Sequence, residues 1–144
     1  MKTATATIAL ALLMCCSAFA QNSACDYWTH GAQYSNESSA LLTRLLADYQ
    51  HAQNWESVDA DHPDAVKVRG KIAREELELK SKTAEEQAHD KEYAGDPETL
   101  HEMIVKARAT CPDIMDTWKE TAKEFDSLVD ELVKQRQRYH ALGY

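Results

Sequence analysis

Apolar and small side chains recur along the chain at steps of three and four, which is the period of an α-helix. The most regular run lies near the C-terminus and has the heptad pattern of a helix-bundle seam: Ile114, Trp118, Thr121, Phe125, Leu128 and Leu132. A second apolar face falls within residues 38–54: Leu41, Leu42, Leu45, Leu46 and Tyr49. No stretch alternates apolar and polar residues as a strand does, so the pattern predicts an all-α fold.

The three prolines mark where helices begin, because each is followed directly by an acid. Proline is tolerated at the first helical position, where its missing N–H has no intrahelical partner, and the acid meets the positive end of the helix dipole. Helices are therefore predicted over residues 63–93, over residues 97–109, and from residue 112 to near the C-terminus. Asp96 is the natural N-cap of the second of these, and Gly95 ends the helix before it.

The helix predicted at residues 63–93 has only a thin apolar stripe among many Lys and Glu residues: Val66, Ile72, Ala73, Leu77, Ala84 and Ala88. An earlier helix is expected over residues 38–54. The pattern does not decide the structure of residues 26–37. Tyr27, Trp28 and Tyr34 either extend that earlier helix or pack as an irregular arm. The sequence thus predicts a single domain over residues 21–144, an antiparallel bundle of about four helices, two long and two shorter.

Residues 1–20 have the pattern of a cleaved export signal. A short basic start precedes an apolar run over residues 8–14, and Ala18-Phe19-Ala20 forms the small-x-small site that a signal peptidase reads. The run is too short to span a bilayer of roughly 30 Å, and the cysteines after it lack the small preceding residue of a lipoprotein signal. We expect cleavage after Ala20 and a periplasmic protein. The alternative is a eukaryotic secreted protein with Asn36-Glu37-Ser38 as a glycosylation acceptor.

Cleavage at that point removes Cys15 and Cys16 and leaves Cys25 and Cys111 as an even pair. A disulfide is the default for such a pair in an oxidising compartment. It would tie the N-terminal arm to the joint between the last two predicted helices. In the chain-entropy model, closing a loop of about 87 residues contributes about 4.6 kcal/mol of stability. A redox-active pair would typically have C-x-x-C spacing, which these cysteines lack, so a structural bond is predicted.

The chain is acidic, with a net charge of −8, and loss of Lys2 with the leader would make it −9. Nucleic-acid phosphates need a basic footprint, and anionic lipid attracts basic segments, so neither is an expected partner. The sequence also contains no G-x-S-x-G motif and no glycine-rich phosphate loop, with four glycines in all. These observations predict a protein that is not an enzyme and carries no cofactor.

Two Glu-x-x-His units are the candidates for a metal site: Glu86 with His89, and Glu98 with His101. On a helix this spacing places carboxylate and imidazole on one face, as in di-iron and di-manganese bundles, and the set would suit Zn²⁺ or Fe²⁺. Glutamate is abundant in this chain, however, so the spacing is expected by chance. The further inward glutamates of ferritin-like carboxylate proteins are not identifiable here, and no metal site is favoured.

His140, in Arg138-Tyr139-His140, resembles the terminal helix of soluble periplasmic four-helix b-type cytochromes, in which a late histidine binds haem. That family also uses a methionine early in its first helix, and no methionine lies between Gln21 and Glu102. Haem is therefore not favoured. The acidic loop at residues 59–64 lacks the central glycine of an EF-hand, so helix capping by Asp61 or His62 explains it better than Ca²⁺ binding.

Three hypotheses of function follow, of which the first is favoured. It is an exported binding protein that blocks another exported protein, similar in size and composition to bacterial immunity proteins and periplasmic inhibitors. Its candidate contact surface is the aromatic set Tyr27, Trp28 and Tyr34. The alternatives are a metal- or haem-binding bundle and a chaperone-like or envelope-stress protein, which the long charged helix at residues 63–93 permits.

Overall fold

The computed structural model describes the chain path over residues 4–144 and its side chains from Ser23 onward. Four helices make up this part: α1 (Ala4–Glu56), α2 (Pro63–Ala94), α3 (Pro97–Thr110) and α4 (Pro112–Ala141). Residues 4–144 contain no strand, and the predicted all-α helical bundle is confirmed. The predicted leader, residues 1–20, depends on residues 1–3 and on side chains before Ser23, all of which lie outside the described part.

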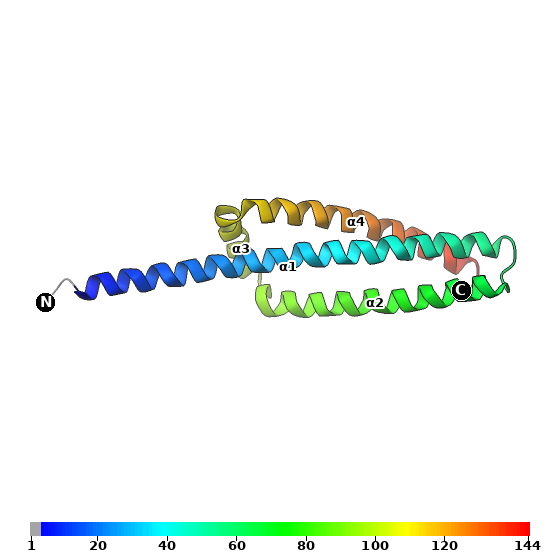
Figure 1. The fold of residues 1–144 in the computed structure, drawn as a ribbon, viewed down its shortest axis with the longest axis horizontal. Coiled ribbons are helices and arrows are strands. Elements are labelled where there is room, and N and C mark those ends of the chain that lie inside the picture. Colours follow the sequence, from blue (N-terminus) through cyan, green and yellow to red (C-terminus); the bar gives the residue numbers. More distant parts are fainter. Residues whose placement is uncertain (1–3) are drawn as a thin grey trace.

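The three long helices lie along one another, and the short α3 crosses one end of the molecule (Figure 1). Helix α2 runs antiparallel to α1 and lies along one side of it in this view. Helix α4 starts on the other side and crosses behind α1 toward its C-terminal end. Because α3 carries the chain across the end where α2 finishes, α4 runs antiparallel to α2 and parallel to α1. Helix α1 is therefore the central element on which the other two long helices pack.

The predicted helix starts are confirmed. Helices α2, α3 and α4 each begin with a proline in the first turn, followed by an acid. The Asp96 side chain accepts a hydrogen bond from the Thr99 backbone N–H and caps α3. At the start of α2 the cap is His62, whose Nδ1 accepts from the Asp64 N–H at 3.2 Å.

Residues 26–37 are helical, so the first of the two alternatives for this segment holds, and α1 extends well before residue 38. This part of α1 has its own buried face, which includes Ala24, Trp28 and Ser35. Gly31 lies on the side that faces α4. A Cβ atom there would come within 3.1 Å of Trp118 Cδ1, so the glycine allows the Trp118 ring to approach the α1 backbone.

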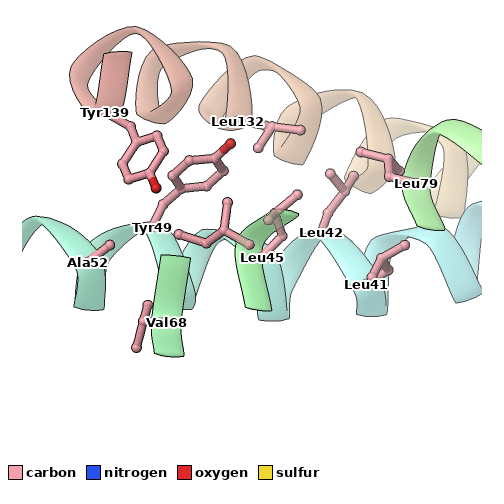
Figure 2. Close-up of a cluster of buried hydrophobic side chains, with 10 residues drawn as sticks. Leu41, Leu42, Leu45, Tyr49, Ala52, Val68, Leu79, Leu132 and Tyr139 are labelled. Carbon is pink, nitrogen blue, oxygen red and sulfur yellow. The ribbon is translucent and has the colours of Figure 1, made fainter. Parts of the chain in front are cut away.

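The main core lies in the half of the bundle away from α3 and joins all three long helices (Figure 2). Leu41, Leu42 and Leu45 of α1 are at most 1% exposed, as the apolar pattern of this segment predicts. Tyr49 of α1 and Tyr139 of α4 meet edge to face, with ring centroids 5.1 Å apart. Leucine burial on this scale stabilises a fold by about 2 kcal/mol per side chain.

A second core lies at the α3 end and contains the predicted disulfide. Trp28 of α1 is 4% exposed and packs with Ala107 of α3 and Met115 of α4. Beside it, Cys25 and Cys111 form a disulfide with their Cα atoms 6.1 Å apart. The bond ties α1 to the α3–α4 joint, so the predicted connection is confirmed.

The apolar stripe predicted for residues 63–93 is not the face of the helix that is buried, so this prediction is wrong. Val66 and Leu77 are 53% and 67% exposed, and of the six predicted positions only Ile72 is buried. The face that packs on α1 follows a different heptad series: Ala65, Val68, Ile72, Glu75 and Leu79. A glutamate occupies one of these positions, so the buried face does not stand out in the sequence as an unbroken apolar stripe. Helix α2 thus has two stripes, and α1 covers one of them.

Candidate functional site

A groove of about 800 Å³ lies between α2 and α4. Within the described residues, both helices pack on α1, but no Cα atom of α2 comes within 8 Å of one in α4. Tyr34 of α1 and Leu79 of α2 also line the groove. The two flanking helices therefore leave an elongated apolar surface between them.

Each wall of the groove carries the heptad spacing of a helix-packing seam. The α2 wall presents Ala73, Leu77, Lys80, Ala84 and Gln87, at steps of four and three. The α4 side of the groove is lined by Phe125, Val129, Leu132 and Arg136 at the same steps. Leu132 itself is only 1% exposed and belongs to the main core. Such seams pack knobs into holes against a further helix. The exposed stripe of α2 thus forms one wall of the groove.

An ion pair joins the two walls at one end. The Arg136 guanidinium donates to both carboxylate oxygens of Glu76, with 2.8 Å from Nε to Oε1, and the Tyr49 hydroxyl donates to the same carboxylate. Burial disfavours ionisation of Glu76, but the hydrogen bonds from Arg136 and Tyr49 outweigh it and lower the pKa of Glu76. Lys80, by contrast, forms no ion pair with any residue in the described part.

A cluster of titratable side chains lies beside the groove, between α1 and α2. His30 Nε2 of α1 is 2.8 Å from Glu86 Oε2 of α2. His89, one turn after Glu86, stacks its ring on that of His30 with centroids 3.8 Å apart and planes 19° apart. One potential ligand atom from each of the three residues lies within 4.8 Å of the others. We call these residues the histidine cluster.

The aromatic rings of Tyr27 and Tyr93 also contact the His89 ring. The Tyr27 ring is stacked on the His89 ring at 5.7 Å, and the Tyr27 hydroxyl donates to Asp90 Oδ1 at 2.7 Å. Burial, and then the Asp90 carboxylate, raise the pKa of Tyr27, so it stays a hydrogen-bond donor at neutral pH. The cluster opens into a cavity of about 310 Å³, which shares Tyr34 with the groove.

A pair of buried carboxyl groups lies farther along the α1–α2 interface. Asp48 is 7% exposed and Glu75 is 8% exposed. Burial first, and then the neighbouring Asp48 carboxylate, raise the pKa of Glu75 to about 7. Lys71 Nζ, 3.2 Å from Asp48 Oδ1, compensates part of this charge.

The predicted aromatic surface is divided between core and cavity. Trp28 is buried in the second core, where its indole N–H donates to the Met103 carbonyl at 3.3 Å, so it offers no surface to a partner. Tyr27 is half-buried against His89. Tyr34, also half-buried, lies between the histidine cluster and the groove, with its ring 5.8 Å from that of Phe125.

The two predicted Glu-x-x-His units do not meet. Glu98 and His101 are exposed on α3 and take no part in the cluster, whereas Glu86 and His89 contact His30. The sequence did not indicate His30 as a member of this cluster, because His30 lies 56 positions before Glu86 and belongs to no local motif. His140 is exposed and its Nδ1 contacts the Tyr144 carbonyl oxygen at the chain end.

None of the helices in residues 4–144 combines the length and apolar character that crossing a membrane requires. The chain matches no known protein family, and no curated protein sequence or solved structure is significantly similar to it.

Proposed function

We propose that this protein is a non-enzymatic binding domain that receives an amphipathic helix of another protein in the groove between α2 and α4. The observation that carries the proposal is the heptad spacing on both walls of an open groove. Leu77, at 67% exposure, projects apolar surface that no element of the described chain covers. Helix-in-groove recognition uses surfaces of this kind.

The groove specifies the chemistry of the helix that fits it. Its α2 wall extends from Ala73 to Gln87, about 21 Å at the helical rise per residue. A partner helix of about four turns would fill it, with apolar residues at i, i+3, i+4 and i+7 facing the seam. We expect the partner helix to place an acidic residue opposite Lys80, because the Lys80 ammonium group has no ionic partner among the described residues.

We further propose that the protein acts outside the cytoplasm, in the periplasm, on another exported protein. The Cys25–Cys111 disulfide supports an oxidising compartment, and the signal-like pattern of residues 1–20 supports export. An inhibitor or immunity protein would use the groove to capture a helix next to the active site of its target. The groove is already formed in the unbound chain, which favours this role because a preformed groove loses little conformational entropy on binding.

Capture with site-specific photocrosslinking tests the proposal. A photoreactive residue at position 77 is expected to crosslink one defined partner from a cell-envelope extract, whereas one at Val105 should not. Val105 is the matched control because it is 52% exposed and lies on α3, away from the groove.

A substitution gives the complementary readout. Leu77→Asp is expected to abolish capture of that partner, and Val105→Asp to preserve it. Both should change the free energy of unfolding by less than about 0.5 kcal/mol, since both sites are exposed. Equal capture by Leu77→Asp and the unchanged protein would contradict the proposal, as would a crosslink between two copies of this chain.

A further inference from the structure

We propose that His30, Glu86 and His89 form a binding site for a divalent transition-metal ion, with Zn²⁺ as the best-matched ion. Two imidazoles and one carboxylate are a ligand set that proteins use for zinc with an open coordination position. The site is separate from the helix-binding seam, and it does not depend on the function proposed for the groove.

The backbone already brings the three ligands together. Glu86 and His89 lie on one face of α2, one turn apart, and α1 supplies His30 from the opposite side. Ligand atoms in a tetrahedral zinc site are about 3.3 Å apart, which follows from metal–ligand bonds of about 2.0–2.1 Å. The three side chains present atoms within 4.8 Å of one another, so the ligand atoms have at most about 1.5 Å to close. The stacked rings of His30 and His89 must turn about their side-chain bonds for their in-plane lone pairs to converge on one ion.

The polar groups of the cluster are not satisfied by the protein alone. His89 Nδ1 is buried and has no hydrogen-bond partner among the described residues. A buried polar atom without a partner costs about 1–3 kcal/mol, so structures rarely tolerate one without a reason. The Glu86 side chain, at 14% exposure, has His30 as its one ionic partner in the described part. A cation between the three groups would neutralise this carboxylate.

The surroundings favour a cation over an anion. Glu37, Glu85 and Glu86 line the cavity, and Lys82 is its one Lys or Arg side chain. Lys82 is 3.6 Å from Glu37, which offsets its charge. The cavity volume of about 310 Å³ leaves room beside the cluster for water or for a fourth ligand such as Glu85. The imidazole and carboxylate set also accommodates Ni²⁺ and Cu²⁺, and Cu²⁺ should bind most tightly by the Irving–Williams order.

Calorimetric titration of the purified, untagged protein with Zn²⁺ tests the site. One ion per chain is expected to bind, and His30→Ala should weaken the affinity at least about tenfold, the lower limit for loss of even an outer-shell partner. His89→Ala and Glu86→Gln should do the same. The matched control is His101→Ala, an exposed histidine on α3, which should leave the affinity unchanged.

Cobalt substitution provides a second readout that does not depend on the variants. Co²⁺ bound by the unchanged protein should give visible d–d bands of a four- or five-coordinate site with nitrogen ligands, and excess Zn²⁺ should abolish them. Far-UV circular dichroism establishes that each variant is folded, and His30→Gln replaces His30→Ala if the alanine variant is not.

Three results would overturn the proposal. The first is the absence of stoichiometric Zn²⁺ binding together with a featureless Co²⁺ spectrum. The second is Zn²⁺ binding that a folded His30 variant leaves unchanged. The third is a loss of affinity in His101→Ala, which would place the metal at α3, where the Glu-x-x-His spacing alone would put it.

Discussion

Replacing Glu75 by Gln is expected to stabilise the protein at pH 8 and to leave its stability nearly unchanged at pH 4. Glu75 and Asp48 are both buried between α1 and α2, at 8% and 7% exposure. Burial and the Asp48 carboxylate raise the pKa of Glu75 from 4.5 to about 7, and the positive charges of Lys71 and Arg44 only partly offset this. The folded protein therefore holds a proton on this pair that the unfolded chain releases at lower pH.

The sign and size of the effect follow from this difference in pKa. Between pH 4.5 and pH 7 the unfolded state binds fewer protons at Glu75 than the folded state, so stability falls as the pH rises. Each unit of pKa corresponds to 1.36 kcal/mol, so the contribution lost by pH 8 is about 3 kcal/mol. Gln has nearly the same shape as protonated Glu and cannot ionise, so the variant does not lose this contribution.

Urea unfolding followed by circular dichroism, from pH 4 to pH 8.5, measures the difference. The free energy of unfolding of Glu75→Gln minus that of the unchanged protein should rise from near zero at pH 4 to about 3 kcal/mol at pH 8. Glu78→Gln is the matched control, because Glu78 is exposed on the same helix and should show no such rise.

Two results would refute this reasoning. If the difference between Glu75→Gln and the unchanged protein were flat across the range, Glu75 would ionise normally in the fold. If Glu75→Gln were less stable at pH 8, the ionised carboxylate would be making favourable contacts with Lys71 and Arg44 that exceed its repulsion from Asp48.

Three further predictions concern the disulfide and two helical glycines. The Cys25→Ser, Cys111→Ser double variant should lose up to about 4.6 kcal/mol of unfolding free energy, the loop-closure estimate, in chemical denaturation; a loss below about 1 kcal/mol would mean that the bond does not constrain the unfolded chain. Gly70→Ala should raise stability by about 0.5–1 kcal/mol, because a Cβ there meets only Arg74 Nη1, at 3.7 Å. Gly31→Ala should gain less than Gly70→Ala or lose stability in thermal melts, because its Cβ would lie 3.1 Å from Trp118 Cδ1; an equal gain would show that the Trp118 ring yields freely.

Features set by neighbouring residues were predictable from the sequence. The starts of α2, α3 and α4 depend on the geometry of proline and on the field at the helix end, both of which act within one turn. The predicted burial of the α1 face around Leu45 and of the α4 seam around Leu132 is also confirmed. A strong heptad pattern places its apolar side chains on one face of the helix, and that face is the one that packs inward. The cysteine pair followed from the predicted leader, because cleavage after Ala20 would leave two cysteines and they allow one pairing.

The register of α2 and the histidine cluster were decided by the tertiary structure. Helix α2 has two stripes of similar apolar content, and packing on α1 selected the one that includes Ile72 and Glu75, leaving Leu77 in the groove. His30 and Glu86 are 56 positions apart, and no local pattern links them before α1 and α2 pack antiparallel. The sequence by itself determined where α2, α3 and α4 begin and which faces of α1 and α4 point inward, because those features depend on interactions within a few residues. It left the start of α1 undetermined. The groove exists because α2 and α4 both pack on α1 while their own backbones stay apart. The candidate metal ligands meet because α1 and α2 pack antiparallel.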